Sequence, residues 1–235
     1  MSILGLFVAF SVFGCVFGAG ELICRQWYLA RPESEYLYTL SVSCSKGSWP
    51  SSLEELSPKI PSNTTHLDLR DISFDRTDSP PVPVLPSMPN LTSLRLDHLY
   101  QSGSDQVLDD FPVWDFINDV NRTRLKALIV SNMDLQGLGG SDLVGFTRLT
   151  ELRFSNCSLR QIHPSSFETL VADNAPYRLM ELGVESDQVL SFFPWESLRP
   201  ISEILWVILE SYQETSRGTT EFKVQAPILT VNSSF

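Results

Sequence analysis

Apolar residues between Leu149 and Leu170 follow a spacing that fits neither a helix nor a strand. The gaps match a repeat pattern, L-x-x-L-x-L-x-x-N/C-x-L, in which a short strand directs two residues inward, a turn follows and a return arm buries the rest. A coil of this kind covers its apolar face only when other coils stack on it. The residues that carry the pattern are Leu149, Leu152, Phe154, Cys157, Leu159, Ile162, Phe167 and Leu170.

The same pattern recurs along the chain, so the sequence predicts a stack of coils. The segment that starts at Leu125 lies 24 residues before Leu149 and repeats its apolar positions in register. Weaker matches give five to seven coils over residues 63–235, with a parallel sheet on the concave face and an irregular convex side. Their predicted starts lie near Thr64 and at Leu91, Leu125, Leu149, Leu179, Ile201 and Ala226. In the sixth coil we expect Ile204 and Trp206 on the strand, and in the seventh Leu229 and Val231.

Two return arms depart from the regular length. Residues 75–88 are rich in proline, which favours extended polyproline geometry over helix. Residues 102–121 hold apolar residues spaced for a short amphipathic helix that Pro112 interrupts. We expect this helix on the convex side, and its aromatic residues form either core or an exposed contact patch.

The chain begins with an uncharged apolar run followed by small residues, which is typical of a secretory signal peptide over residues 1–20. No Lys or Arg precedes the run. An uncleaved anchor is the alternative. It is the less favoured one, because about 20 apolar residues are needed to span a bilayer and Glu21 closes the run. The segment Val12 to Cys15 also resembles a bacterial lipoprotein cleavage box. No later apolar run is long enough to span a bilayer, so we expect no membrane span in the mature chain.

Charge and sequons favour an exported protein. The net charge of −11 argues against nucleic acid or an anionic membrane as the main partner, since both select for Lys and Arg. It is equally compatible with simple solubility. Five N-x-S/T sequons exceed the chance expectation and indicate a glycoprotein. They stand at Asn63, Asn90, Asn121, Asn156 and Asn232.

These features together resemble the extracellular leucine-rich repeat superfamily, in the 24-residue class of Toll-like receptor and Slit-type ectodomains. The resemblance covers roughly residues 40–200. It implies an α/β leucine-rich repeat solenoid that binds a protein or glycan without catalysis or cofactor. Residues 21–62 resemble the N-terminal cap of that superfamily, which implies a disulfide between Cys24 and Cys44. No cysteine follows Cys157, so we expect an uncapped C-terminus or a chain that is incomplete.

One departure from the family concerns the turn after each strand. The ninth position of a coil usually carries Asn, whose amide bonds the backbone of neighbouring turns. Here no Asn stands at that position, and apolar side chains cannot satisfy buried backbone groups, so we expect irregular turns. Asn132 and Asn156 stand one place early, which would fit a local slip in register. The ninth residues are Ile72, Leu99, Met133, Cys157 and Asp187.

The strand residues between the inward leucines point to the concave face, where they form the candidate binding site. Arginine beside exposed apolar surface is common at binding hot spots. An ordinary solvated face is the alternative. The candidate residues are Asp68, Arg70, Arg95, Ile129, Glu151 and Arg153.

The sequence contains no motif for catalysis or metal binding. His66, His98 and His163 stand in different coils and make no metal-ligand spacing with the cysteines, and we expect Cys157 to be a buried thiol. No nucleophile elbow, P-loop or zinc-protease motif occurs. We therefore expect no enzyme and no metal. The favoured function is a secreted or receptor-ectodomain binding protein, and the alternative is an adhesive or structural component of the matrix or cell surface.

Overall fold

The computed structural model describes residues 21–30, 38–50, 52–75, 84–102, 111–159, 161–171, 181–186, 206–215 and 218–226. The predicted signal peptide lies outside these residues, and so do the sequon at Asn232, Asp187, and Leu229 and Val231 of the predicted seventh coil. Within the described ranges, no helix combines the length and the apolar character needed to cross a bilayer.

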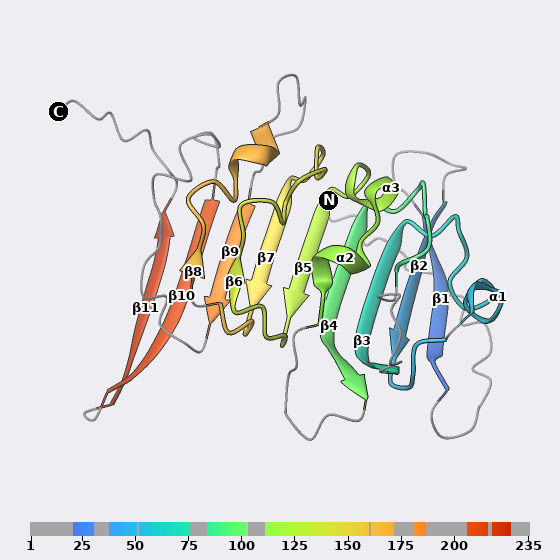
Figure 1. Cartoon of the computed structure of the whole chain (residues 1–235), viewed down its shortest axis with the longest axis horizontal. Helices are drawn as coiled ribbons and strands as arrows, with labels where there is room; N and C mark the ends of the chain where they lie inside the picture. Colours follow the sequence, from blue (N-terminus) through green and yellow to red (C-terminus); the bar gives the residue numbers. More distant parts are fainter. Residues whose placement is uncertain are drawn as a thin grey trace, which may run out of the picture.

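A nine-stranded sheet organises the chain, in the order β1-β2-β3-β4-β5-β7-β9-β10-β11 (Figure 1). The strands from β2 to β10 run parallel, and an antiparallel strand closes each end. This confirms the predicted solenoid with a parallel sheet. The strands are β1 (Ile23–Ala30), β2 (Tyr38–Ser45), β3 (His66–Asp75), β4 (Ser93–Ser102), β5 (Ala127–Ser131), β7 (Glu151–Ser155), β9 (Glu181–Ser186), β10 (Trp206–Thr215) and β11 (Gly218–Ala226).

The connections cover one side of this sheet and contain little helix (Figure 1). Each described helix is a single turn, so the described part is a β-type solenoid rather than the predicted α/β arrangement. A second sheet of two short strands, β6 (Gly137–Leu138) and β8 (Gln161–Ile162), forms where two return arms stack. The helices are α1 (Leu53–Leu56), α2 (Val113–Phe116), α3 (Asp119–Arg122) and the 3-10 turn η1 (Glu168–Val171).

The core lies between the sheet and these connections. Because side chains alternate along a strand, the two apolar residues of each repeat point to the same side, and the parallel register stacks them in columns. All the members from β3 to β7 are at most 2% exposed. One column holds Leu67, Leu94, Leu128 and Leu152, and the next holds Leu69, Leu96, Val130 and Phe154.

A column of left-handed residues bends the chain within β3 and β4 and directly after β5 and β7, and it explains the early asparagines. Asp71, His98, Asn132 and Asn156 all have φ between 51° and 54°. Asn and Asp are the residues that tolerate this conformation best after glycine. The registers of β3, β4, β5 and β7 stay continuous, so the slip in register that we considered from the sequence does not occur.

The apolar ninth residues follow this bend and point inward. Ile72, Leu99, Met133 and Cys157 are at most 1% exposed. The turn backbone is nevertheless bonded between coils, because Asn132 N–H donates to Ser155 O at 2.9 Å and Leu135 N–H donates to Cys157 O at 3.0 Å. β3 and β4 even remain paired beyond the bend, as far as their last residues. The expected irregularity of these turns is therefore wrong where they are described: neighbouring strands supply the hydrogen bonds that an Asn ladder would supply.

The N-terminal cap is an antiparallel hairpin of β1 and β2, with Cys24 opposite Cys44. The two cysteines form the expected disulfide, with their Cα atoms 4.0 Å apart. β2 then pairs parallel with β3, so the cap continues the sheet of the coils. Cys44 is fully buried and joins the same core.

The predicted amphipathic segment contributes core rather than an exposed patch. α2 follows Pro112, and residues 103–110 lie outside the described residues. Phe111, Phe116 and Ile117 are at most 6% exposed, and the Trp114 ring packs edge-on against Phe154. Buried rings cannot form a surface, so the described aromatic residues close the covered side of the sheet.

The last strands follow a register that differs from the predicted one. β10 pairs parallel with β9, and Val207 and Leu209 align with Leu182 and Val184. The sequence placed Ile204 and Trp206 at those positions, three residues earlier. Ala226, the predicted start of a seventh coil, is instead the last residue of β11, which runs antiparallel to β10.

Candidate ligand-binding face

The side of the sheet opposite the core corresponds to the predicted concave face, and we call it the open face. Its described surface from β1 to β7 consists of the strand residues that alternate with the buried ones. The described connections pack on the other side (Figure 1). The open face is therefore the side on which the described strands carry their polar and charged side chains.

The central row of the open face contains four of the six predicted site residues. The parallel register aligns Asp68, Arg95, Ile129 and Arg153 on consecutive strands, and Gly183 of β9 continues the row. Strands in a sheet are about 4.8 Å apart, so these side chains form one continuous strip. The order predicted from the repeat spacing is thus the order in space.

Four charged residues on β3 and β4 form an alternating square. Arg70 Nε donates to Asp68 Oδ1 at 2.8 Å along β3, and Arg95 Nη2 lies 3.4 Å from Asp97 Oδ2 along β4. Across the strands, Asp68 stands beside Arg95 and Arg70 beside Asp97. Opposite charges therefore adjoin in both directions, which fixes the orientation of both arginines.

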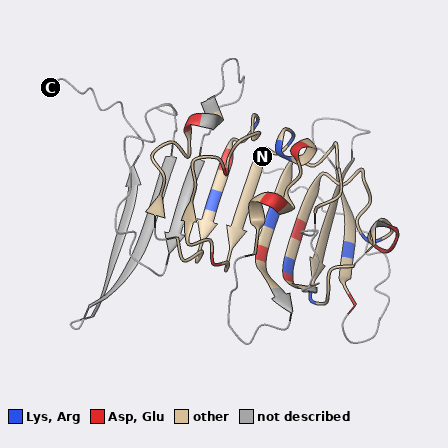
Figure 2. Ribbon diagram, viewed as in Figure 1, with Lys and Arg blue, Asp and Glu red and all other residues tan. Residues whose placement is uncertain are grey.

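Next to this square, β5 presents an uncharged stripe. Its residues on this face are the half-buried Ala127 and Ile129 and the buried Ser131, and Figure 2 shows β5 without colour between the charged strands β4 and β7. On β7, Arg153 Nε lies 2.9 Å from Glu151 Oε1. The apolar side chain of Ile129 is thus flanked by two arginines, each about 40% exposed.

The ion pairs orient Arg70, Arg95 and Arg153 but add little to the stability of the fold. The hydrogen bond to Asp68 raises the pKa of Arg70, and the charges of Asp68, Asp97 and Asp71 add to the effect. Pairs this exposed contribute about 0–1 kcal/mol each to the free energy of unfolding. A bound partner can therefore replace them at small cost to the fold.

The open face does not share the acidic balance of the chain. From β1 to β7 it carries the cations Arg25, Arg70, Arg95 and Arg153 against the anions Asp68, Asp97 and Glu151. The whole chain has a net charge of −11. From β1 to β7 this face is thus locally neutral to basic, whereas the register of β9 adds Glu181 and Glu185 beyond β7.

The sequons differ in accessibility. Asn63 and Asn90 are exposed just before β3 and β4, and Asn156 is exposed at the bend after β7. Asn121 is fully buried, and its amide bonds Met88 N and Pro86 O at 2.9 Å each. A glycan on Asn121 does not fit this folded structure, because the side chain is buried and both atoms of its amide are bonded.

Asn121 is instead a structural residue, which gives a direct prediction. We expect Asn121→Gln to lower the free energy of unfolding by about 1–3 kcal/mol, because a longer amide cannot keep both buried bonds. Urea unfolding of unglycosylated protein measures this, with Asn63→Gln as the matched control at an exposed site. Equal stability of the two variants would contradict the structural role.

The remaining polar candidates make no chemical site. Cys157 is buried, its Sγ donates to Val130 O at 3.2 Å, and burial raises the pKa of the thiol to about 12. His163 Nδ1 lies 2.7 Å from the Ser165 hydroxyl in a turn on the return arm that follows β7, not on the open face. The described residues include no cluster of three His, Cys, Asp or Glu side chains arranged to hold a metal.

The sequence analysis missed the contribution of the cap to this face. In the β1–β2 register, Arg25 aligns with Ser43 and Trp27 with Ser41, so β1 extends the rows by one strand. Two-residue alternation in the segment Ile23–Ala30 carries this information once its antiparallel pairing is known.

Comparison of the chain with known protein families and with curated proteins finds no match.

Proposed function

We propose that the chain is an extracellular leucine-rich repeat glycoprotein that binds a protein or glycan through the open face and performs no catalysis. The observation that carries this proposal is the strip of Arg95, Ile129 and Arg153, which are aligned on three adjacent strands. Two oriented arginines beside an apolar side chain offer both desolvated contact and charged hydrogen bonds to a ligand.

Three further observations support an extracellular binding role. The disulfide between Cys24 and Cys44 is of a kind that persists in oxidising compartments. Asn63 and Asn90 are exposed in connections, as glycan acceptors must be. The repeat spacing of the third and fourth coils resembles extracellular leucine-rich repeats, whose usual activity is binding.

The proposal is tested by reversing both arginines. We expect Arg95→Glu combined with Arg153→Glu to weaken binding at least about tenfold, because each reversal removes a charged contact and repels an acidic ligand group. Wild-type protein is first screened against a glycan array and a panel of purified cell-surface ectodomains. Affinities for the hits are then measured by surface plasmon resonance.

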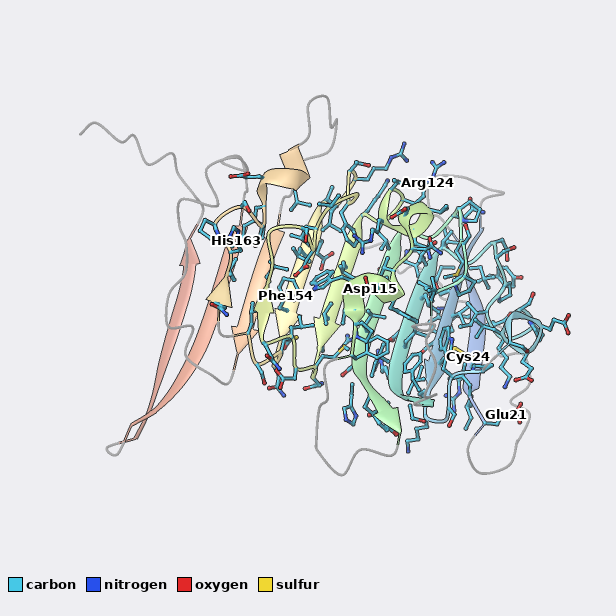
Figure 3. The ribbon with its side chains drawn as sticks, viewed as in Figure 1. Glu21, Cys24, Asp115, Arg124, Phe154 and His163 are labelled. Carbon is cyan, nitrogen blue, oxygen red and sulfur yellow. A yellow bond between two sulfur atoms is a disulfide. The ribbon has the colours of Figure 1, made fainter. Side chains whose placement is uncertain are left out.

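The matched control reverses two arginines outside the open face. Arg124 and Arg148 stand in the connections that lead into β5 and β7, and Figure 3 shows Arg124 at the margin of the sheet. Arg124→Glu combined with Arg148→Glu gives the same change in net charge, and binding should be retained. Unchanged affinity of the Arg95 and Arg153 variant would sink the open-face site.

An adhesive or structural role is the second candidate, and one observation favours it. Ile23, Tyr28 and Leu29 are exposed on the edge strand β1. Apolar residues on an edge promote association between chains. Saturable one-to-one binding of a soluble hit favours the first candidate, whereas clustering on matrix or cell surfaces without such binding favours the second.

A further inference from the structure

The strand β1 is one edge of the sheet, and it lacks the protection that edge strands usually have. Sheet edges are normally blocked by charges, prolines or bulges, because their free backbone groups pair with other strands. β1 has eight residues, one charge at Arg25 and no proline. Three of the six exposed large apolar residues of the described chain lie on it, namely Ile23, Tyr28 and Leu29.

The pairing with β2 shows which backbone groups of β1 face outward. Cys24 and Cys44 are directly opposite with Cα atoms 4.0 Å apart, which identifies a pair without mutual hydrogen bonds, since hydrogen-bonded pairs are about 5.5 Å apart. The N–H and C=O groups of Cys24 therefore point away from β2. By alternation, those of Gln26 and Tyr28 do the same, and no described backbone group outside the strands bonds them.

Side chains leave this edge accessible. The Gln26 amide donates to Pro58 O and Lys59 O at 3.1 and 3.0 Å, so it is held on the covered side of the sheet. Arg25 and Trp27 point to the open face, in line with Ser43 and Ser41. Figure 1 shows β1 as the last strand at this end of the sheet, with α1 beside it. Among the described strands, none pairs with β1 on this side, so its outward backbone groups lack a strand partner there.

We propose that β1 pairs antiparallel with β1 of a second copy of this chain, about a two-fold axis at Gln26, so that one sheet continues through both copies. In this register Gln26 meets its own counterpart in a hydrogen-bonded pair, and Cys24 stands opposite the partner's Tyr28. On the open face, Arg25 stands opposite the partner's Trp27, and Ile23 opposite the partner's Leu29.

The side chains select this occupant and this register. Each Arg25 lies beside an indole of the other copy, which gives two cation–π contacts, and each Ile23 meets an apolar side chain. A shift of two residues in one direction sets Arg25 against its own counterpart, and like charges directly opposite are destabilising. A shift in the other direction moves Ile23 beyond the end of the partner strand. The register about Gln26 pairs Ile23–Leu29 with the same residues of the partner, leaves Ala30 unpaired, and alone of the three registers sets Arg25 beside an indole.

The proposal is independent of the ligand of the open face, and its test uses the full chain secreted from eukaryotic cells without any ligand. Sedimentation equilibrium at micromolar concentrations should show a dimer. Trp27→Lys sets a lysine opposite the partner's Arg25 at two places and should raise the dimer dissociation constant roughly tenfold. Trp27→Glu forms opposite-charge pairs at the same places and should retain the dimer.

Two further variants test the backbone pairing and the register. Gln26→Pro removes an outward N–H that β2 does not use, so it should abolish the dimer while the β1–β2 hairpin persists. Arg25→Glu combined with Trp27→Lys restores opposite charges in the swapped order and should restore dimerisation. Val120→Lys, at an exposed apolar residue of α3, is the control that leaves the dimer intact.

Three results would overturn the proposal. These are a wild-type monomer at every concentration, equal effects of Trp27→Lys and Trp27→Glu, and a dimer that survives Gln26→Pro. Circular dichroism and the thermal midpoint of each variant identify any loss of folding. Where a single variant does not fold, the double variant Arg25→Glu with Trp27→Lys provides the test. A dimer of the double variant supports the proposed pairing, and a monomer contradicts it.

Discussion

Replacing Phe116 with alanine is expected to lower the free energy of unfolding by about 3–5 kcal/mol, the range for removal of a buried aromatic ring. Phe116 is fully buried. Its ring centroid lies 5.4 Å from that of Trp49, 5.7 Å from that of Phe74 and 5.4 Å from that of Phe111. These rings come from the cap, the first coil and the second return arm, so one substitution loosens three layers of the solenoid.

The close packing of this ring cluster is the reason for the large expected loss of stability. Tightly packed rings relax only partly around a cavity, and each lost edge-to-face pair adds about 0.5–1.5 kcal/mol beyond the area term. Urea unfolding followed by tryptophan fluorescence measures the change, because Trp49 reports on the cluster itself.

A substitution on the next helix, α3, serves as the control for this prediction. Val120 of α3 is 44% exposed, and Val120→Ala should change the free energy of unfolding by no more than about 0.5 kcal/mol. A Phe116→Ala variant as stable as this control would show that the ring cluster does not hold the coils together.

Removal of the disulfide is expected to lower the free energy of unfolding by about 3 kcal/mol. The bridge closes a loop with a sequence separation of 20, and cross-linking a loop of that length restricts the unfolded chain by about this amount. The variant Cys24→Ala with Cys44→Ala tests this, because alanine leaves no buried hydroxyl at Cys44. The effect should fall on the cap, since the bridge joins β1 to β2.

Two measurements separate this effect from a general loss of packing. Urea unfolding gives its size, and hydrogen exchange locates it in β1 and β2 while β5 and β7 keep their protection. Cys157→Ala serves as the comparison, because that thiol forms no bridge. An unfolding free energy equal to that of wild type, or a loss of protection spread evenly over all strands, would contradict the prediction.

The repeat spacing predicted the open face in detail. Leu94, Leu128 and Leu152 hold the same position in successive coils, although the return arms between them differ in length, and one parallel register satisfies all three at once. A shift by one residue would move every apolar side chain of a strand to the solvent, so the register is strongly determined. The row of Asp68, Arg95, Ile129 and Arg153 follows from that register without further information.

The prediction failed where the spacing carried no periodic signal. The sequon at Asn121 looks like the one at Asn63, because three residues define both, yet only the packing of a return arm buries one and exposes the other. Ile72 and Leu99 suggested turns with unpaired backbone, since the sequence does not show that β3 and β4 remain paired beyond the bend. In β10, where no regular interval precedes the strand, the predicted register differed by three residues.

The sequence by itself therefore determined the stacking of coils, the direction of the strands between the caps and the side on which each strand residue lies. Those properties depend on local alternation and on a repeated interval, and both are linear features of the chain. Only the tertiary structure decided that Asn121 is a buried bonding group, that the aromatic residues of α2 are core, and that β1 adds Arg25 and Trp27 to the open face. These depend on contacts between segments far apart in the chain, where burial and pairing are set by packing geometry rather than by spacing.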